Sequence, residues 1–341
     1  MAIQHLQMVI PQALGHLRQL QQEKTAPQAL PLLQACLQQG ERTRLWQQED
    51  LFHARVELWQ QSLLYALPLE LRQHGLAAAA LSWRGEGGVR RRGSCLHVEP
   101  VHFQAGMDDV RCLMPSPLTG EQSAQLLQSL QPLLSLAGFE LLHATEDAGG
   151  HWYLWCDREL QLTTFSLRSH SSAGLYDLMP QGADSGELRR LMTEVQMLLH
   201  DHPVNQQREA RGLLPVNALW LWGNAPLGLV TRPCPTRVIS NASYVRGLCE
   251  HLEVDCWPLP PDAQSLPGVD AEQVLLVLPP DPMTEIETRW LAPLHTALLS
   301  GEIRRLDLHL DHWMVSLQGG RWQQVRRWLN GRGHDVAELL S

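Results

Sequence analysis

The feature that most constrains this chain is a short, wholly apolar run near its C-terminal end, residues 274–278 (VLLVL), closed at once by two prolines. Such a run, bounded by turn residues, is typical of a buried β-strand. Residues 214–222 (LPVNALWLW) end at Gly223 and predict a second buried strand. Helices must cover strands of this kind, so we expect an α/β protein.

Helical apolar spacing recurs on both sides of these strands. Predicted helices cover residues 29–37, which end near Gly40, and residues 51–71, 187–202, 241–251 and 285–299. The helix at 187–202 stops before Pro203, as helices usually do, and the stripe at 51–71 is interrupted at Pro68. Further core strands are expected at residues 3–11 and 303–310.

The middle of the chain has a different pattern. Short strands at residues 95–103, 109–114 and 151–156 surround one helix at 121–137, which indicates an α+β module. A glycine- and arginine-rich stretch, residues 85–93, precedes this module. We therefore predict an α/β core sheet flanked by helices and built from residues 1–84 and 214–341, with an inserted α+β domain at 85–213.

Composition narrows the function classes. The 341 residues carry a formal net charge of -9, so no global basic field favours nucleic acid as a partner. The seven cysteines form no CxxC pair and fit reduced thiols in the cytoplasm. No leader opens the chain, and no apolar run reaches the roughly 18 residues of a membrane span. We expect a soluble cytoplasmic protein with no membrane contact.

A motif around residues 202–223 carries a family resemblance. His202-Pro203-Val204-Asn205 is followed by Arg208, and a strand containing Asn217 then ends in glycine. This pattern resembles the archaeal-type cofactor-independent phosphoglycerate mutases of the alkaline phosphatase superfamily. The chain is more similar still to a bacterial branch, the phosphoglycerate mutase-like or RpfE-type regulatory proteins. The resemblance covers residues 176–252 and implies an alkaline-phosphatase-like core sheet.

The resemblance also implies a metal site. Enzymes of this superfamily clamp the transferred phosphoryl group with two metal ions, and their first strand ends in an aspartate. Here the first predicted strand ends at Gln12, and no aspartate precedes Asp50. The remaining metal-ligand candidates follow two core strands: Asp281 with Glu285 where the family has D-x-x-x-H, and Asp311 with His312. The alternative is structural, with Asp281 in a turn and Glu285 in a first helical turn.

The sequence shows neither a recognisable nucleophile nor the phosphate-binding arginines that the resemblance implies. Ser62 lies inside a predicted helix, and Ser82 is the nearest alternative. The family's arginine-rich run should follow the strand at 109–114, where residues 115–120 read PSPLTG. Anion-binding candidates come from the motif region instead: His202, Asn205, Arg208, Arg211 and Asn217. For Asn205 and Arg208 the alternative is a structural role, in which they cap the preceding helix and hold the following strand in place.

Three functions follow from these patterns. The first is a phosphoglycerate mutase-like protein, apparently degenerate, that is non-catalytic or regulatory, needs no cofactor and is not an active mutase. The second is a divergent metal-dependent phosphotransferase or phosphohydrolase that uses Mn, Zn or Mg on a small phosphorylated substrate. The third is a protein-interaction module, suggested by the tryptophans of residues 319–340. The expected partner is an unidentified protein or a small phosphorylated ligand.

Overall fold

The computed structural model describes residues 3–22, 30–46, 55–106, 110–144, 151–169, 175–227, 236–266 and 272–319. The chain divides into two compact units. The first comprises Met1–His53, Leu58–Arg72 and Val230–Ser341, and the second comprises Ala54–Glu57 and Gln73–Leu229. The tryptophan-rich segment predicted to form a helix lies, from residue 320 onward, outside the described residues.

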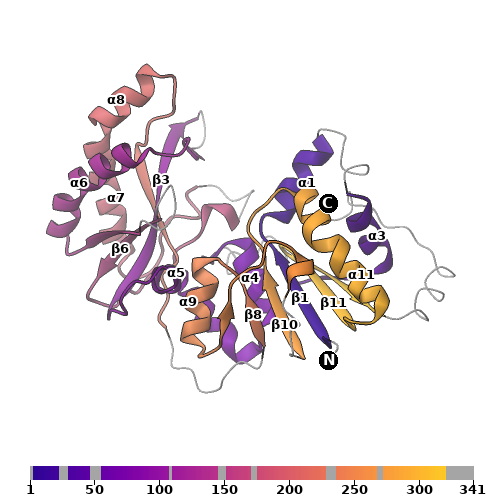
Figure 1. Cartoon of the computed structure of the whole chain (residues 1–341). Helices are drawn as coiled ribbons and strands as arrows, with labels where there is room; N and C mark the ends of the chain where they lie inside the picture. Colours follow the sequence, from indigo (N-terminus) through magenta and orange to yellow (C-terminus); the bar gives the residue numbers. More distant parts are fainter. Residues whose placement is uncertain are drawn as a thin grey trace. The chain divides into compact units, whose positions relative to one another are not determined.

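The first unit is built on a seven-stranded sheet with the order β2-β12-β11-β1-β10-β8-β9 (Figure 1). Its parallel strands are β1 (His5–Ile10), β8 (Arg237–Ile239), β9 (Cys256–Trp257), β10 (Gln273–Val277) and β11 (Arg305–Leu310). Two antiparallel strands, β12 (Trp313–Gln318) and β2 (Glu41–Arg44), close one side. Strand β1 lies at the centre, where Leu6 pairs with both Val274 and Leu306.

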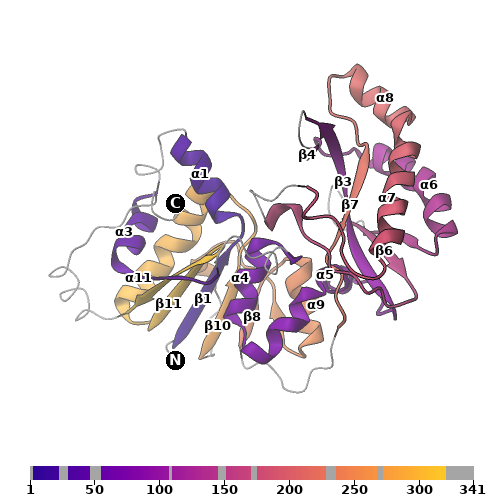
Figure 2. The same ribbon diagram turned by 180° about the vertical axis from the view of Figure 1, so that it is seen from behind.

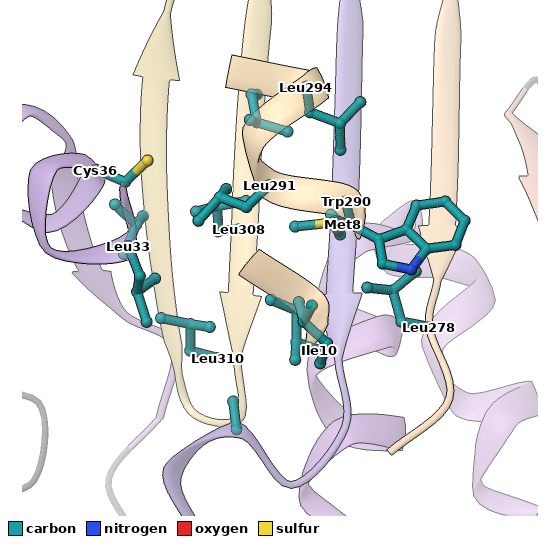
Figure 3. Packing of buried hydrophobic residues seen from close by; sticks show 14 of the residues in the cluster. Met8, Ile10, Leu33, Cys36, Leu278, Trp290, Leu291, Leu294, Leu308 and Leu310 are labelled. Atoms are coloured by element: carbon teal, nitrogen blue, oxygen red, sulfur yellow. The ribbon is translucent and has the colours of Figure 1, made fainter. Parts of the chain in front are cut away.

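One face of this sheet carries the main apolar core (Figure 3). Alternate residues Met8 and Ile10 of β1 and Leu308 and Leu310 of β11 are fully buried there. The covering helices are α1 (Ala13–Gln22), α3 (Pro31–Gln39), α10 (Met283–Ile286), the π-helical turn η5 (Glu287–Leu291) and α11 (Ala292–Ser300). The predicted helix at 285–299 is therefore three consecutive helical segments, with a π turn at its centre.

The opposite face of β1 and β11 is covered by α4 (Leu58–Ala66), which Figure 2 shows in front of the sheet. A 3₁₀ helix, η2 (Leu69–Leu76), follows α4 after the expected break at Pro68. Helix α9 (Ser243–His251) contacts β9, and the short η4 (Ala263–Ser265) contacts α11.

The second unit is an antiparallel sheet with helices. Its strands β4 (Val110–Leu113), β3 (Ser94–Ala105), β6 (His151–Cys156) and β5 (Glu140–Ala144) follow in that order, and β7 (Ala218–Trp222) pairs with β3. Its helices are α5 (Ala78–Gly85), α6 (Gly120–Leu136), η3 (Leu167–Ser169), α7 (Ser185–His200) and α8 (Pro203–Ala210). Thr119 and Gln122 form a capping box at the start of α6.

The predicted fold class, an α/β core sheet flanked by helices, is confirmed by this topology. The unit boundaries differ from the expected domain limits, because they fall after Arg72 and before Val230 rather than at 85 and 213. The pairing of β7 with β3 joins residues 218–222 to the second unit, and the contact of α5 (Ala78–Gly85) with β3 joins residues 78–85 to it. Among the described helices, none combines the length and the apolar character of a bilayer span.

Gly40 follows α3, near the predicted end of this helix. Its φ of -80° and ψ of 152° are angles that any residue can adopt. A Cβ at this position would collide with the Val315 side chain. Glycine is therefore required here by the close approach of β12.

Candidate functional site

The candidate site lies at the carboxyl ends of the parallel strands in the first unit, where open α/β sheets usually bind ligands. Gln12 follows β1, Asp281 follows β10, and Asp311 and His312 form the turn between β11 and β12. Gln12 and Asp311 both have left-handed backbones, with φ of 57° and 52°. Aspartate tolerates this conformation better than most residues.

The carboxylate of Asp311 is engaged by a helix start. Its Oδ2 accepts a hydrogen bond from the backbone N–H of Leu14 at 2.9 Å, and the residue is only 2% exposed. The first N–H groups of a helix have no partner within the helix, and the helix dipole favours negative charge there. Asp311 therefore stabilises the first turn of α1 from the far end of the chain.

His312 lies beside Asp311 in an apolar environment. Its ring packs edge-on against Trp46 at 6.3 Å, and the residue is 2% exposed. Burial, assisted by the positive charges of Arg44 and Arg18, lowers the pKa of His312 to about 4. Its Nδ1 is buried with no hydrogen-bond partner among the described residues. His312 is therefore a neutral imidazole at pH 7.

Asp281 and Glu285 both face one cation. Arg289 Nη1 lies 3.7 Å from Asp281 Oδ2 and 3.6 Å from Glu285 Oε2. The Glu285 side chain is 55% exposed, so its ion pair contributes little to stability. Both carboxylates therefore lie next to the Arg289 guanidinium, at positions where the resemblance implies a metal ion.

The described residues do not fit a metal centre. No group of three or more His, Cys, Asp or Glu side chains in these ranges could hold a metal ion. Asp281, Glu285, Asp311 and His312 therefore form no such group, and their role as ligands stays a prediction.

A buried polar layer lies between the sheet and α4. His309 Nδ1 is 3.1 Å from Ser62 Oγ, and His309 Nε2 is 3.2 Å from Gln7 Oε1. Gln7 donates its own amide N–H to the carbonyl of Ala66 at 3.2 Å. Since the Gln7 oxygen can only accept, His309 carries its proton on Nε2 and accepts the Ser62 hydroxyl at Nδ1. Burial lowers the pKa of His309 to about 4, so it stays neutral.

The serine of this layer has a base beside it but cannot reach a substrate. Ser62 is 0% exposed in the middle of α4, with His309 also buried at 1%. Ser82, the alternative serine, is 4% exposed in α5, and its side chain hydrogen-bonds the hydroxyl of Tyr153. Among the serines singled out by the sequence, neither is an accessible nucleophile.

Asp307 completes the polar face of β11. Its Oδ2 lies 2.7 Å from His5 Nε2, and its Oδ1 accepts from Arg305 Nε at 2.9 Å. Burial would raise the pKa of Asp307, but the hydrogen bonds from His5, Arg305 and Ser316 outweigh it and lower the pKa to about 2. Asp307, His309 and Asp311 are all buried. α4 covers His309 through Ser62, whereas Asp311 is buried against the first turn of α1.

The anion-binding candidates lie in the second unit, around α7, α8 and β7. His202 caps α8, with Nδ1 accepting from Val204 N–H at 3.2 Å and Nε2 lying 2.9 Å from Ser129 Oγ. Asn205 donates to the carbonyls of Leu199 and Val216 at 2.8 and 2.7 Å. It also accepts from Val216 N–H at 2.8 Å. These two side chains therefore hold the turn between α7 and α8 against the strand that follows.

Arg208 is the most buried of these candidates. It is 0% exposed, and its guanidinium donates to four neutral acceptors: the Leu214 carbonyl, Gln122 Oε1, and the carbonyl and hydroxyl of Ser116. Burial lowers the pKa of Arg208, but an arginine side chain stays protonated in proteins. Ser116 belongs to the segment where the resemblance implied an arginine-rich run, so Arg208 binds that segment directly.

The last two candidates differ in exposure. Asn217 forms a pair of hydrogen bonds with the backbone of Phe103, accepting from its N–H at 2.7 Å and donating to its carbonyl at 2.9 Å. Arg211 is exposed at the end of α8. The structure therefore brings His202, Asn205 and Arg208 into one structural network around α8, while Arg211 points into solvent.

Comparison with known proteins gives one significant local similarity. The chain is 44% identical over 77 residues to a 2,3-bisphosphoglycerate-independent phosphoglycerate mutase of Methanothrix thermoacetophila. These residues make up 21% of this chain and 20% of that relative. No protein-family model matches. A segment of the chain is therefore related to cofactor-independent phosphoglycerate mutases, while most of that relative's length has no counterpart in the match.

Two solved structures overlap the chain loosely. A cofactor-independent phosphoglycerate mutase from Thermoplasma acidophilum covers 93% of this chain, with 90% of its own length, at 14% identity and a TM-score of 0.39. A protein from Pyrococcus horikoshii covers 100%, with 97% of its own length, at 11% identity and a TM-score of 0.43. With overlaps this loose, the fold class rests on the sheet order itself.

Proposed function

We propose that this chain is a phosphoglycerate mutase-like protein of the alkaline phosphatase superfamily with a non-catalytic or regulatory role. The observation that carries the proposal is the hydrogen bond from Leu14 N–H to the Asp311 carboxylate at 2.9 Å. A carboxylate buried at a helix start would have to give up that contact to bind a metal. Asp281 and Glu285 are likewise paired with Arg289.

The state of the serines supports the same proposal. Phosphoryl transfer onto a serine requires its hydroxyl to reach the substrate. Ser62 is a fully buried residue of α4, and its hydroxyl is hydrogen-bonded to His309. We propose that a cytoplasmic protein of this kind binds a protein partner or a small phosphorylated ligand. Arg211 is the anion-binding candidate that such a ligand can reach, since the Arg208 guanidinium already serves neutral acceptors.

A divergent metal-dependent phosphotransferase or phosphohydrolase is the second candidate. The observation that favours it is His312, whose neutral ring has a buried Nδ1 with no hydrogen-bond partner in the described part of the chain. A neutral imidazole nitrogen is a common metal ligand. In this candidate His312 and Asp311 would hold Mn, Zn or Mg together with Asp281 and Glu285.

Metal analysis of the purified full-length protein separates the two candidates. The non-catalytic proposal expects far less than one equivalent of Mn, Zn or Mg after dialysis against each metal, with the same result for Asp281→Ala. One or more retained equivalents that fall in both Asp281→Ala and His312→Ala would overturn it in favour of the metal-dependent enzyme. Arg211→Ala serves as the matched control, because this change lies outside the first unit.

A further inference from the structure

Two cysteines of the first unit are brought together by the turn after α9. Cys249 lies in the last turn of α9, and Cys256 begins the edge strand β9. Between them the chain reverses through Glu253, whose φ is 55°, and Val254 N–H bonds to the carbonyl of Cys249 at 3.0 Å. Pairing of Cys256 with Val238 of β8 then fixes the second cysteine beside the first.

The thiol of Cys249 forms a hydrogen bond with Cys256. The sulfur of Cys256 also lies 3.6 Å from the carbonyl oxygen of Ser240. Cys249 is 3% exposed, while Cys256 is half-buried. The pair therefore has one member that a small reagent can reach and one that is enclosed behind it.

The electrostatics distinguish Cys256 from other cysteines of the chain. The hydrogen bond from Cys249 lowers the pKa of Cys256, against the opposing effect of burial, and the positive charge of Arg246 acts in the same direction. Burial instead raises the pKa of Cys36 and Cys112 to about 12, and it raises those of Cys95 and Cys156. The thiolate is the nucleophile, and Cys256 is the less buried thiol of the pair, so Cys256 reacts first with a reagent from solvent.

We propose that Cys249 and Cys256 form a thiol pair that a peroxide oxidises reversibly to an intramolecular disulfide. The Cys256 thiolate attacks one peroxide oxygen, so an S–O bond forms, the O–O bond breaks, and the departing hydroxide takes a proton to become water. The Cys249 sulfur then attacks the Cys256 sulfur, the S–S bond forms, and the S–O bond breaks. The second water carries away the Cys249 proton, so two thiols lose two electrons and one peroxide becomes two waters.

The local geometry suits this closure. A disulfide bond is about 2 Å long, so two hydrogen-bonded sulfurs need only a short further approach. Strand β9 has two residues and lies at the edge of the sheet, with only β8 as a neighbour. Cys256 can move toward α9 without displacing another strand.

Peptide mapping tests the proposal directly. The reduced full-length protein is treated briefly with one equivalent of hydrogen peroxide, unfolded in the presence of iodoacetamide and digested with trypsin. Cleavage after Arg246 and Arg289 leaves both cysteines in one peptide, residues 247–289. We expect this peptide to lose both alkyl groups and the mass of two hydrogen atoms, and to recover them after dithiothreitol. Full alkylation of both cysteines, or a disulfide that joins Cys256 to any other cysteine, would overturn the proposal.

Two single variants test separately which cysteine reacts with the peroxide and which one closes the disulfide. In Cys249→Ser, Cys256 should stop at the sulfenic acid, which dimedone traps. In Cys256→Ser, the rate at which Cys249 loses alkylation should fall at least tenfold. The matched control is Cys112→Ser, which should keep the wild-type rate of closure. Equal oxidation of Cys249 in wild type and Cys256→Ser would contradict the assignment of Cys256 as the attacking thiol.

Discussion

The carboxylate of Asp311 accepts the backbone N–H of Leu14 at 2.9 Å, which joins the end of β11 to the first turn of α1 across 297 positions of the chain. Removing a helix cap usually costs ~1–2 kcal/mol. Asp311→Ala should lower the free energy of unfolding by about 2 kcal/mol, since alanine also tolerates the left-handed backbone poorly.

Asp311→Asn is the matched variant, because asparagine keeps an acceptor and tolerates the same backbone. Asp311→Asn should cost less than about 1 kcal/mol, and Asp281→Ala, at a half-buried position, about 0.5 kcal/mol or less. Urea unfolding followed by circular dichroism measures all three. Equal effects of Asp311→Ala and Asp281→Ala would show that the cap does not stabilise α1.

Arg208 is expected to be a structural residue of the second unit. Arg208→Met keeps most of the side-chain volume but leaves the Leu214 carbonyl, Gln122 and Ser116 without their donor. Buried acceptors left unpaired cost ~1–3 kcal/mol each, so we expect a loss of at least ~3 kcal/mol. Arg211→Met, on the exposed end of α8, should change stability by less than about 0.5 kcal/mol. Thermal unfolding compares the pair, and similar melting temperatures would refute the structural role.

Asp307 should stabilise the protein in a defined pH range. Its pKa is about 2 in the folded chain, below the ordinary 3.8, because His5, Arg305 and Ser316 bind the carboxylate. A carboxyl whose pKa is depressed by folding stabilises the fold above its unfolded pKa, and that contribution is lost as pH falls from about 4 to about 2. Asp307→Asn should therefore lose about 2 kcal/mol at pH 7 and approach wild type near pH 2. A difference in unfolding free energy between wild type and Asp307→Asn that stays constant from pH 7 to pH 2 would contradict this prediction.

His309 should make the fold sensitive to mild acid. Its pKa is about 4 in the folded chain because of burial, whereas an unfolded histidine titrates near 6.5. The unfolded chain binds the proton first, so stability falls by about 1.4 kcal/mol per pH unit between about 6.5 and 4 from this residue alone. In His309→Gln this slope should shrink by that amount, while the exposed His200→Gln should keep it. Denaturant unfolding at several pH values measures this slope. If the free energy of unfolding depended on pH in the same way in His309→Gln as in wild type, His309 would not be buried and neutral.

Local patterns predicted most of the fold. Residues 274–278 gave β10, residues 187–202 gave α7, and the break at Pro68 separated α4 from η2, because apolar period and proline act over a few residues. The pairing of β7 with β3 was not predicted, because the apolar pattern of a strand does not specify which other strand it pairs with. This pairing accounts for the shift of the boundary from 213 to Leu229.

The candidate site was predicted less completely, because its contacts join distant segments. Asp311 and His312 were identified from their place after a core strand, but the helix that Asp311 caps begins nearly 300 positions earlier. Glu287 caps α3 in the same way, through Leu32 and Leu33 N–H groups at 3.0 and 3.1 Å, and no sequence signal pointed to it. The contact between His309 and Ser62 of α4 likewise joins segments 247 positions apart, so no local pattern pointed to it.

We propose that this phosphoglycerate mutase-like protein has no mutase turnover. The most direct measurement is a coupled assay of 3-phosphoglycerate conversion to 2-phosphoglycerate by the purified full-length protein with Mn, Zn or Mg. A cofactor-independent mutase assayed in the same buffers serves as the positive control. We expect the protein to convert 3-phosphoglycerate no faster than a reaction without protein, whichever of the three metals is present. Metal-dependent conversion that disappears in Asp281→Ala would contradict it.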